Sequence, residues 1–234
     1  MKIYVDHSVS SNQILPIRDD FWNHYLTNVR RVREGDSLEV VGGGNVGAGT
    51  VVSTDPFSIE VKSTRVADQP QYSLILCQAI SRKSSFDDIV RNVSDLGVTE
   101  IVPILSERTV RRPNQPEKMH DRWRRIVLDS SRVSNRDWVA RIHPMMDWEE
   151  SLEFSSNRGK LYWGDTGGGS PGDCFRSTTQ QAVLYVGPEG GFNSSEKESL
   201  DSLGKPVSLG QENFRAGTAA LMLSTLWLDH QGWI

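Results

Sequence analysis

The chain has 234 residues, of which 37% are hydrophobic and 24% are charged, and its formal net charge is −4. This length allows one large domain or a small domain joined to a medium one, and the composition is that of ordinary soluble proteins. The first six residues form no apolar signal core, and the longest apolar stretch, near residues 219–228, is too short to span a bilayer. We therefore expect neither a secreted nor a membrane-spanning protein but a cytoplasmic one, with no membrane partner.

The two cysteines, Cys77 and Cys174, lie far apart, and the sequence contains no Cys-x-x-Cys pair or Cys/His cluster. A zinc or iron–sulfur site would need such a cluster. Isolated cysteines in the cytoplasm remain reduced. We therefore expect two structural thiols and no bound metal.

Basic residues are concentrated in one part of the chain. Residues 108–141 contain ten basic and four acidic side chains, so this segment carries a net charge of +6 and the remainder carries −10. Arg30, Arg31 and Arg33 form a second basic group. Segregated charge of this kind can bind a phosphate backbone even when the total charge is negative. The charge pattern alone leaves nucleic-acid binding and an ordinary solvated helix face equally open.

Residues 1–69 have the pattern of a mostly β domain. Short apolar runs at residues 38–41, 50–52 and 58–62 are separated by turn signals, which is typical of a small barrel or sandwich. The glycine-rich residues 42–49 lack a Gly-Lys-Ser/Thr sequence and are followed by no helical pattern. They therefore predict a hairpin rather than a phosphate-binding loop.

From residue 71 the apolar period changes to an alternation of strands and helices. Residues 73–80 predict a strand, residues 86–96 a helix that stops at Gly97, residues 98–105 a strand, and residues 119–133 a second amphipathic helix. Such alternation is typical of a parallel, doubly wound sheet. We place the domain boundary near residues 69–70.

The region after the second helix is predicted in less detail. Residues 148–154 are expected to be helical, residues 160–163 to form a strand, and residues 167–172 to form a loop.

The last fifty residues contain two buried strands that each end in a glycine-bearing bend. Residues 183–186 run into Gly187-Pro188-Glu189-Gly190-Gly191-Phe192, and residues 206–209 run into Gly210. Glycines remove side chains, so a ligand can approach the backbone closely. Bends at the carboxyl ends of parallel strands are typical ligand sites, which predicts a small-molecule cofactor there.

Helices follow both bends. Asn193-Ser194-Ser195-Glu196 is a capping box that opens a helix ending at Gly204. The second helix is apolar nearly all round, which predicts burial against the sheet and against a second subunit. Arg215 is the one charge on its first turn, where the helix dipole opposes a cation. An anionic or oxygen-rich ligand explains this residue; a salt bridge to Glu189 or Glu212 is the alternative.

Several motifs, taken together, match one known family. In chain order they are His24-x5-Arg30-x4-Gly35-Asp36, Gln78-Ala79-Ile80-Ser81-Arg82, Asp95-Leu96-Gly97-Val98, Pro103-x-x-Ser106-Glu107-Arg108, Arg122-Trp123-x-x-Ile126, Val186-Gly187-Pro188-Glu189-Gly190-Gly191-Phe192 and Leu209-Gly210-x4-Arg215-x-x-Thr218-Ala219. The chain thus resembles the RsmE-type methyltransferases of the SPOUT class. These enzymes transfer a methyl group to N3 of a uridine in bacterial small-subunit (16S) ribosomal RNA.

The resemblance implies a fold and partners. The fold is α/β: a PUA-like RNA-binding β-barrel domain, residues 1–69, is followed by a trefoil-knotted SPOUT methyltransferase domain with a parallel sheet, residues 70–234. The implied cofactor is S-adenosylmethionine. The implied partners are ribosomal RNA or the small ribosomal subunit, and a second copy of the chain in a homodimer.

The resemblance also assigns roles to residues. Arg215 is the expected catalytic residue, since it can hold a uracil oxygen and stabilise the developing anion. Residues expected to contact the cofactor are Leu161, Tyr162, Val186, Gly187, Pro188, Glu189, Gly190, Gly191, Leu209, Gly210, Gln211, Asn213, Phe214 and Thr218. Residues expected to contact RNA phosphates are Arg30, Arg82, Arg108, Arg111, Arg112 and Arg122.

The final loop departs from the family pattern. The family usually reads Arg-x-Glu-Thr where this chain has Arg215-Ala216-Gly217-Thr218, so an acidic side chain is missing. Asn92 and Val133 also stand where the family usually has charged or polar residues. Two alternatives to an active uridine N3-methyltransferase therefore stay open: an RNA-binding homologue that no longer catalyses, and an enzyme of the same fold that methylates another nucleotide.

Overall fold

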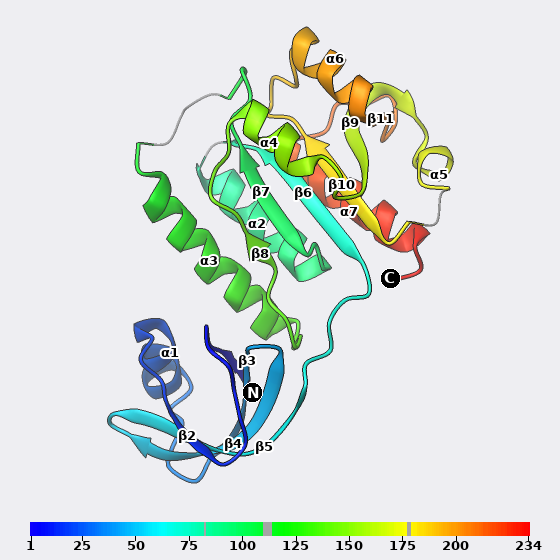
Figure 1. The fold of residues 1–234 in the computed structure, drawn as a ribbon. Coiled ribbons are helices and arrows are strands. Elements are labelled where there is room, and N and C mark those ends of the chain that lie inside the picture. Colours follow the sequence, from blue (N-terminus) through cyan, green and yellow to red (C-terminus); the bar gives the residue numbers. More distant parts are fainter. Residues whose placement is uncertain (82, 110–113, 177–178) are drawn as a thin grey trace. The chain divides into compact units, whose positions relative to one another are not determined.

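The structure is a computed structural model that describes residues 1–81, 83–109, 114–176 and 179–234. By contacts between Cα atoms the chain divides into two compact units. The first unit contains Met1–Gln69 and Ser131–Val139, and the second contains Pro70–Ser130 and Ala140–Ile234. Figure 1 shows the elements of both.

The first unit is built on a mixed five-stranded sheet with the order β1-β3-β4-β5-β2. Its strands are β1 Lys2–Tyr4, β2 Gln13–Pro16, β3 Ser37–Gly42, β4 Asn45–Thr54 and β5 Phe57–Val66. Strands β1 and β3 pair in parallel, and the other pairs are antiparallel. Gly43 and Gly44, with φ angles of 57° and 79°, form the two-residue turn between β3 and β4. The predicted glycine-rich hairpin is therefore confirmed.

The first unit also contains a helical segment that the sequence analysis missed. Helix α1 spans Asp20–His24 and continues as a π-helical turn, η1, over Tyr25–Val29. Asp19 caps its start by accepting hydrogen bonds from the N–H groups of Phe21 and Trp22. Only Trp22 and Leu26 are buried from this segment. Two buried positions are too few to produce a recognisable helical period.

The second unit contains a six-stranded, wholly parallel sheet with the order β11-β9-β10-β6-β7-β8. Its strands are β6 Ser73–Ala79, β7 Glu100–Ile104, β8 Arg141–Ile142, β9 Lys160–Gly169, β10 Gln181–Val186 and β11 Gly204–Val207. Because all strands run in one direction, their carboxyl ends meet at the same edge. The predicted parallel sheet is confirmed.

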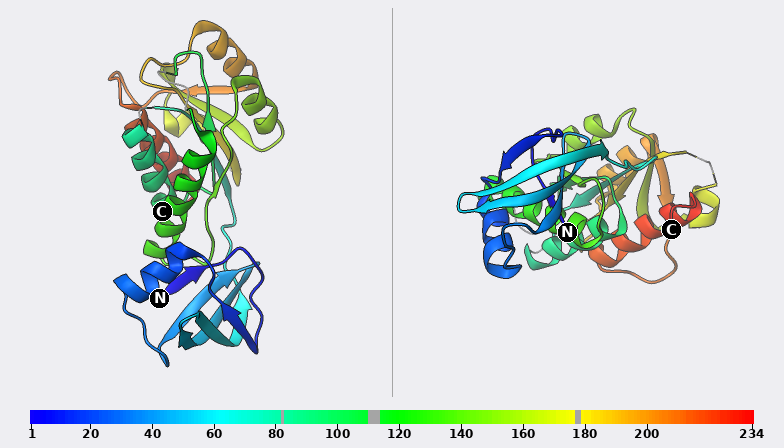
Figure 2. Two further views of the ribbon diagram at one scale, coloured as in Figure 1. Left: turned by 90° about the vertical axis from the view of Figure 1, so that its left-hand side faces the viewer. Right: turned by 90° about the horizontal axis from the view of Figure 1, so that it is seen from below.

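Helices cover both faces of this sheet (Figures 1 and 2). They are α2 Lys83–Leu96, α3 Pro116–Val133, α4 Trp148–Ser155, α5 Pro171–Cys174, α6 Ser194–Leu203 and α7 Ala216–His230. Helix α2 packs on α7 on one face, and α4 and α6 lie on the other. The core beneath α4 and α6 includes Tyr185, Phe192 and Leu200. Gly97, with a φ angle of 121°, ends α2 as predicted.

The predicted loop at residues 167–172 is wrong. Strand β9 continues to Gly169, and Ser170 caps the short helix α5. The glycines that suggested a loop instead let β9 and β11 approach each other, since a Cβ atom on Gly168 would lie 2.5 Å from the carbonyl carbon of Pro206. Both cysteines are free thiols, and burial raises the pKa of the Cys77 thiol to about 12.

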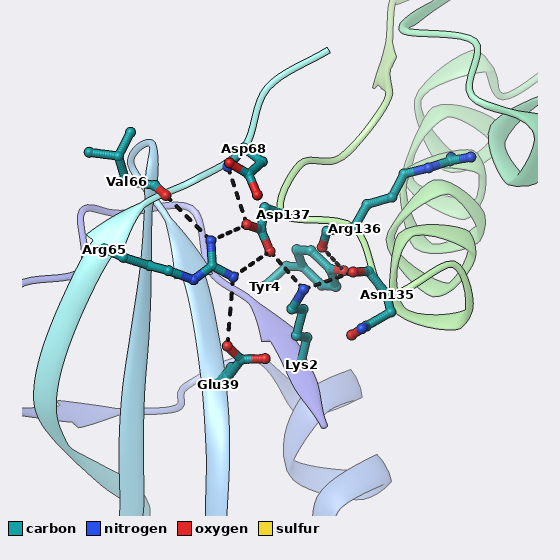
Figure 3. A network of polar contacts seen from close by, with 9 residues as sticks. All are labelled: Lys2, Tyr4, Glu39, Arg65, Val66, Asp68, Asn135, Arg136 and Asp137. Atoms are coloured by element: carbon teal, nitrogen blue, oxygen red, sulfur yellow. Dashed lines mark hydrogen bonds and ion pairs between the residues drawn. The ribbon is translucent and has the colours of Figure 1, made fainter. Parts of the chain in front are cut away.

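Residues 131–139, which the sequence analysis placed in the second domain, pack with the first unit (Figure 3). Asp137 is buried and accepts hydrogen bonds from the Lys2 ammonium at 2.6 Å, from the Arg65 guanidinium and from the N–H of Asp68 at 3.2 Å. The Tyr4 hydroxyl donates to the carbonyl of Arg136 at 2.8 Å. The Arg65 guanidinium, helped by Lys2, holds the pKa of Asp137 well below its ordinary value. The basic segment is thus divided between the two units.

Candidate functional site

A cavity of about 480 Å³ lies at the carboxyl ends of β10 and β11 and beside the middle of β9 in the second unit. The bend after β10 and the bend after β11 both line it, as does the first turn of α7. The residues of its wall are Arg108, Gly164, Asp165, Thr166, Val186, Gly187, Pro188, Glu189, Gly190, Gly191, Phe192, Lys197, Val207, Leu209, Gly210, Glu212, Asn213, Phe214, Ala216 and Ala219. The two bends that the sequence singled out therefore meet at one site.

Most of the predicted cofactor contacts lie on this wall. The ten that do are Val186, Gly187, Pro188, Glu189, Gly190, Gly191, Leu209, Gly210, Asn213 and Phe214. Gln211 and Thr218 are exposed and are not part of the wall. Leu161 and Tyr162 are buried in β9, where Leu161 belongs to the core and Tyr162 packs edge-on against Phe175. The continuation of β9, residues 164–166, takes their place on the wall because this strand is longer than predicted.

Glycines shape both bends. The N–H of Gly191 donates to the carbonyl of Pro188 at 2.9 Å and closes a tight turn. Gly191 and Gly210 have φ angles of 67° and 127°, and a Cβ atom on either would meet no atom within 4 Å. Both positions favour glycine because of their backbone conformation, and the absence of a side chain leaves open space beside each bend. The amide nitrogen of the fully buried Gln78 donates to the carbonyl of Val186 at 3.3 Å, where the first bend begins.

The predicted capping box at the start of α6 is confirmed and has a second use. Asn193 accepts from the N–H of Glu196, and Glu196 accepts from the N–H of Asn193, both at 2.8 Å. The other oxygen of the buried Glu196 accepts from the N–H of Glu107 at 2.8 Å. This hydrogen bond fastens the loop after β7 to α6. The adjoining Arg108 donates to the carbonyl of Gly190 at 2.8 Å.

An ion pair on the cavity wall was not found from the sequence. The Lys197 ammonium bonds to the carboxylate of Asp165 and lies 5.6 Å from the centre of the Trp163 ring. Burial by itself raises the pKa of Asp165, but hydrogen bonds from Lys197 and from the N–H of Gly167 outweigh it and lower that pKa. The two residues are separated by 32 positions. No sequence motif joins them.

Arg215 is exposed at the N-cap position of α7 and makes no side-chain capping bond. Among the described residues it forms no ion pair with Glu189, Glu212 or any other carboxylate. The structural salt bridge considered above is therefore absent from the described part of the chain. The cation remains opposed by the helix dipole and accessible to a ligand.

The missing acidic side chain at Gly217 has a packing explanation. A Cβ atom on Gly217 would lie 3.1 Å from Cγ1 of Ile89 in α2. Helices α2 and α7 are in contact. Glycine therefore lets the two helices pack closely where the family usually has a carboxylate.

The predicted RNA contacts fall into three groups. Arg30 and Arg108 are exposed. Arg122 pairs with the carboxylate of Asp87 at 2.5 Å, and Asp87 is buried and also accepts from the indole of Trp123. This pairing gives Arg122 a structural role in joining α2 to α3. Arg82, Arg111 and Arg112 lie outside the described residues.

Neither a metal site nor a membrane-spanning helix is observed in the described part of the chain. Among residues 1–81, 83–109, 114–176 and 179–234, no group of three or more His, Cys, Asp or Glu side chains is placed to hold a metal ion. Within the same ranges, no helix has the length and apolar character needed to cross a bilayer.

Comparisons with known proteins agree with the geometry. The profile of the RNA methyltransferase domain family matches residues 68–228. A ribosomal RNA small subunit methyltransferase E from Synechocystis is 32% identical over 205 residues, which covers 84% of this chain and 67% of that protein. The chain belongs to the RsmE family of RNA methyltransferases. A relative of the same description from Aquifex aeolicus is 26% identical and covers 92% of this chain and 94% of its own.

Solved structures show the same fold as this RsmE-family protein. A ribosomal RNA small subunit methyltransferase E from Neisseria gonorrhoeae, bound to S-adenosyl methionine, superposes with a TM-score of 0.86 at 24% identity. It covers 97% of this chain and 96% of its own. A methyltransferase from Legionella pneumophila in complex with SAM gives a TM-score of 0.88 at 20% identity, with coverage of 97% and 96%. The predicted order of a β-rich domain followed by a parallel-sheet α/β domain is therefore confirmed.

Proposed function

We propose that this RsmE-family protein transfers the methyl group of S-adenosylmethionine to N3 of a uridine in small-subunit (16S) ribosomal RNA. The observation that carries the proposal is the convergence of the bends after β10 and β11 on one cavity. The family membership supports the reaction class. The choice of uridine, of its N3 atom and of ribosomal RNA as the target is proposed in addition.

The residues present fit this cofactor. A volume of about 480 Å³ lies within the range of small-molecule pockets, roughly 300–1,000 Å³. S-adenosylmethionine has no phosphate, so it needs no phosphate-binding lysine loop. Backbone N–H and C=O groups at residues 187–191 and 209–214 would hold the adenosine, and the open space beside Gly191 and Gly210 leaves room for it. When bound, the cofactor supplies an electrophilic methyl group.

Arg215 is the proposed catalytic residue. Methylation at uracil N3 requires a weakly acidic N–H to lose its proton, and negative charge then develops on the uracil oxygens. The exposed Arg215 guanidinium, at the start of α7, would donate to one of these oxygens and stabilise that charge. A positioned acceptor, or water, would take the departing proton. Holding the base beside the methyl group supplies much of the remaining rate.

Basic side chains would hold the RNA. Arg30 is exposed, and we propose that it contacts phosphates together with the arginines at positions 82, 111 and 112. The target base must leave its stack to reach a cavity of this kind. We also propose that the first unit, which adds residues 131–139 to the expected residues 1–69, forms the PUA-like RNA-binding domain and that the second unit forms the knotted methyltransferase domain.

A homodimer is part of the proposal. Helix α7 buries Ala220, Leu223 and Trp227, whereas Leu221 and Met222 keep part of their surface exposed. A second copy of the chain would cover Leu221 and Met222, which lie on the same helix whose first turn lines the cavity. Analytical ultracentrifugation tests this point, and a monomer at micromolar concentration would contradict it.

The second candidate function is RNA binding without catalysis. Gly217 favours it, because the family's carboxylate is absent and a Cβ atom at this position would crowd Ile89. The experiment is transfer of a labelled methyl group from S-adenosylmethionine to small ribosomal subunits that lack the modification. Incorporation at uridine N3 supports the proposal, and incorporation at another atom identifies a different target. No incorporation, together with measurable cofactor binding, supports the second candidate.

A further inference from the structure

Arg108 was predicted to contact RNA, but the structure places it on the wall of the cavity. Its guanidinium donates one hydrogen bond to the carbonyl of Gly190 at 2.8 Å. A Cβ atom on Gly190 would lie 3.5 Å from Cδ of Arg108, so the stem of the side chain packs along this bend. Arg108 therefore belongs to the proposed cofactor site as well as to the exposed surface.

The backbone of Arg108 is held firmly. The N–H of Glu107 donates to the buried carboxylate of Glu196, and the N–H of Ser106 donates to the Thr109 hydroxyl at 3.0 Å. The N–H of Thr109 in turn donates to the carbonyl of Ser106 at 3.0 Å. A side chain that starts from a fixed backbone and is braced by Gly190 loses little freedom when it binds a ligand.

The charges on the wall single out Arg108. Its cations are Arg108 and Lys197, and its carboxylates are Asp165, Glu189 and Glu212. Lys197 is already paired with Asp165. Among the described residues, Arg108 makes no ion pair, and the Gly190 bond uses one of the five N–H donors of its guanidinium. Arg108 is thus the wall cation, within the described part of the chain, that is available to an anionic group.

We infer that Arg108 binds the carboxylate of the methionine part of S-adenosylmethionine while it braces Gly190. The inference rests on the proposed function. The carboxylate is the one anionic group of that cofactor, and a planar guanidinium with free N–H groups is the side chain best suited to receive it. Arg108 is then a specificity residue: it favours ligands that carry the amino-acid part over nucleosides that lack it.

Calorimetry with two ligands tests the inference. S-adenosylhomocysteine keeps the carboxylate, whereas 5′-methylthioadenosine lacks the whole amino-acid part. Arg108→Met should lower the affinity for S-adenosylhomocysteine by roughly 10- to 100-fold, which is the usual effect of losing a charge-assisted hydrogen bond. Binding of 5′-methylthioadenosine should change by less than about twofold, because methionine keeps the stem that packs on Gly190. Arg125→Met, an exposed arginine on α3 outside the wall, is the matched control.

Each other outcome is decisive. An equal loss for both ligands would show that Arg108 acts only through the Gly190 bend, and no loss for either would leave it as an RNA contact; both results overturn the inference. If the Arg108→Met protein does not fold, the contact can be tested by altering the ligand in place of the protein. Unaltered protein should bind decarboxylated S-adenosylhomocysteine more weakly than the parent compound by a similar factor, and equal binding refutes the contact. If unaltered protein binds neither nucleoside, the proposed function itself fails.

Discussion

Replacement of Asp137 by asparagine should lower the free energy of unfolding of the first unit, and the contacts of Asp137 allow the size of the loss to be estimated. The carboxylate is 4% exposed and its partner Lys2 is 6% exposed, at 2.6 Å (Figure 3). Removing one member of a buried ion pair costs about 3–5 kcal/mol, because the other charge stays buried without a partner. Arg65 is 49% exposed, so water compensates most of its loss. Asparagine keeps one oxygen acceptor, so we expect a total near the lower limit, about 3 kcal/mol.

Hydrogen exchange followed by mass spectrometry can measure this effect in each unit separately. A loss of about 3 kcal/mol should speed the exchange of β1 and β5 by roughly 100-fold, where exchange requires opening of the first unit. Strands β6 and β10 of the second unit should exchange as before. Glu34→Gln removes an exposed carboxylate from the same unit and serves as the control. Uniform acceleration in both units, or none in β1 and β5, would refute the role given to Asp137.

The same carboxyl group determines how this unit responds to acid. The pKa of Asp137 is lowered in the folded protein, chiefly by Arg65. Its contribution to stability is therefore fully present above the pKa of an unfolded aspartate, about 3.9, and is lost as the pH falls below that value towards the folded pKa. Between pH 5 and 8 Asp137 should therefore add no pH dependence to the free energy of opening that is measured by hydrogen exchange in β1, after correction for the intrinsic exchange rate.

Three further predictions concern the second unit and RNA binding. Arg215→Ala should abolish methyl transfer and leave the affinity for S-adenosylhomocysteine within about twofold, because Arg215 lies outside the cavity wall; undiminished turnover would contradict its catalytic role. Gly217→Glu should destabilise the second unit by about 1–3 kcal/mol in urea unfolding, since a Cβ atom there crowds Ile89. The added substitution Ile89→Ala should relieve this crowding, and a stable Gly217→Glu protein would show that the helices separate freely. Affinity for ribosomal RNA should fall steeply with salt, and Arg30→Ala should reduce the slope of log K against log[salt] by about one unit; a flat salt response would exclude phosphate contacts.

Short-range features of this protein were accessible from the sequence. The Asn193–Glu196 capping box, the Gly43-Gly44 turn and the stop at Gly97 each depend on residues within a few positions of one another. The apolar runs of β6, β7 and β10 are long enough to indicate buried parallel strands. The two glycine bends could be placed at one site because parallel strands bring their carboxyl ends to one edge. Local chemistry and that topological rule together sufficed for the outline of the cavity.

Only the tertiary structure decided which side chains complete the site and which segments belong to each unit. Lys197 reaches Asp165 across 32 positions, and Arg108 reaches Gly190 across 82. Asp137 joins Lys2 across 135 positions and so draws residues 131–139 into the first unit. The length of β9 was likewise set by its pairing with β11. These contacts depend on how distant segments pack, and the local sequence around a charged residue or a glycine does not indicate which distant residue it will contact.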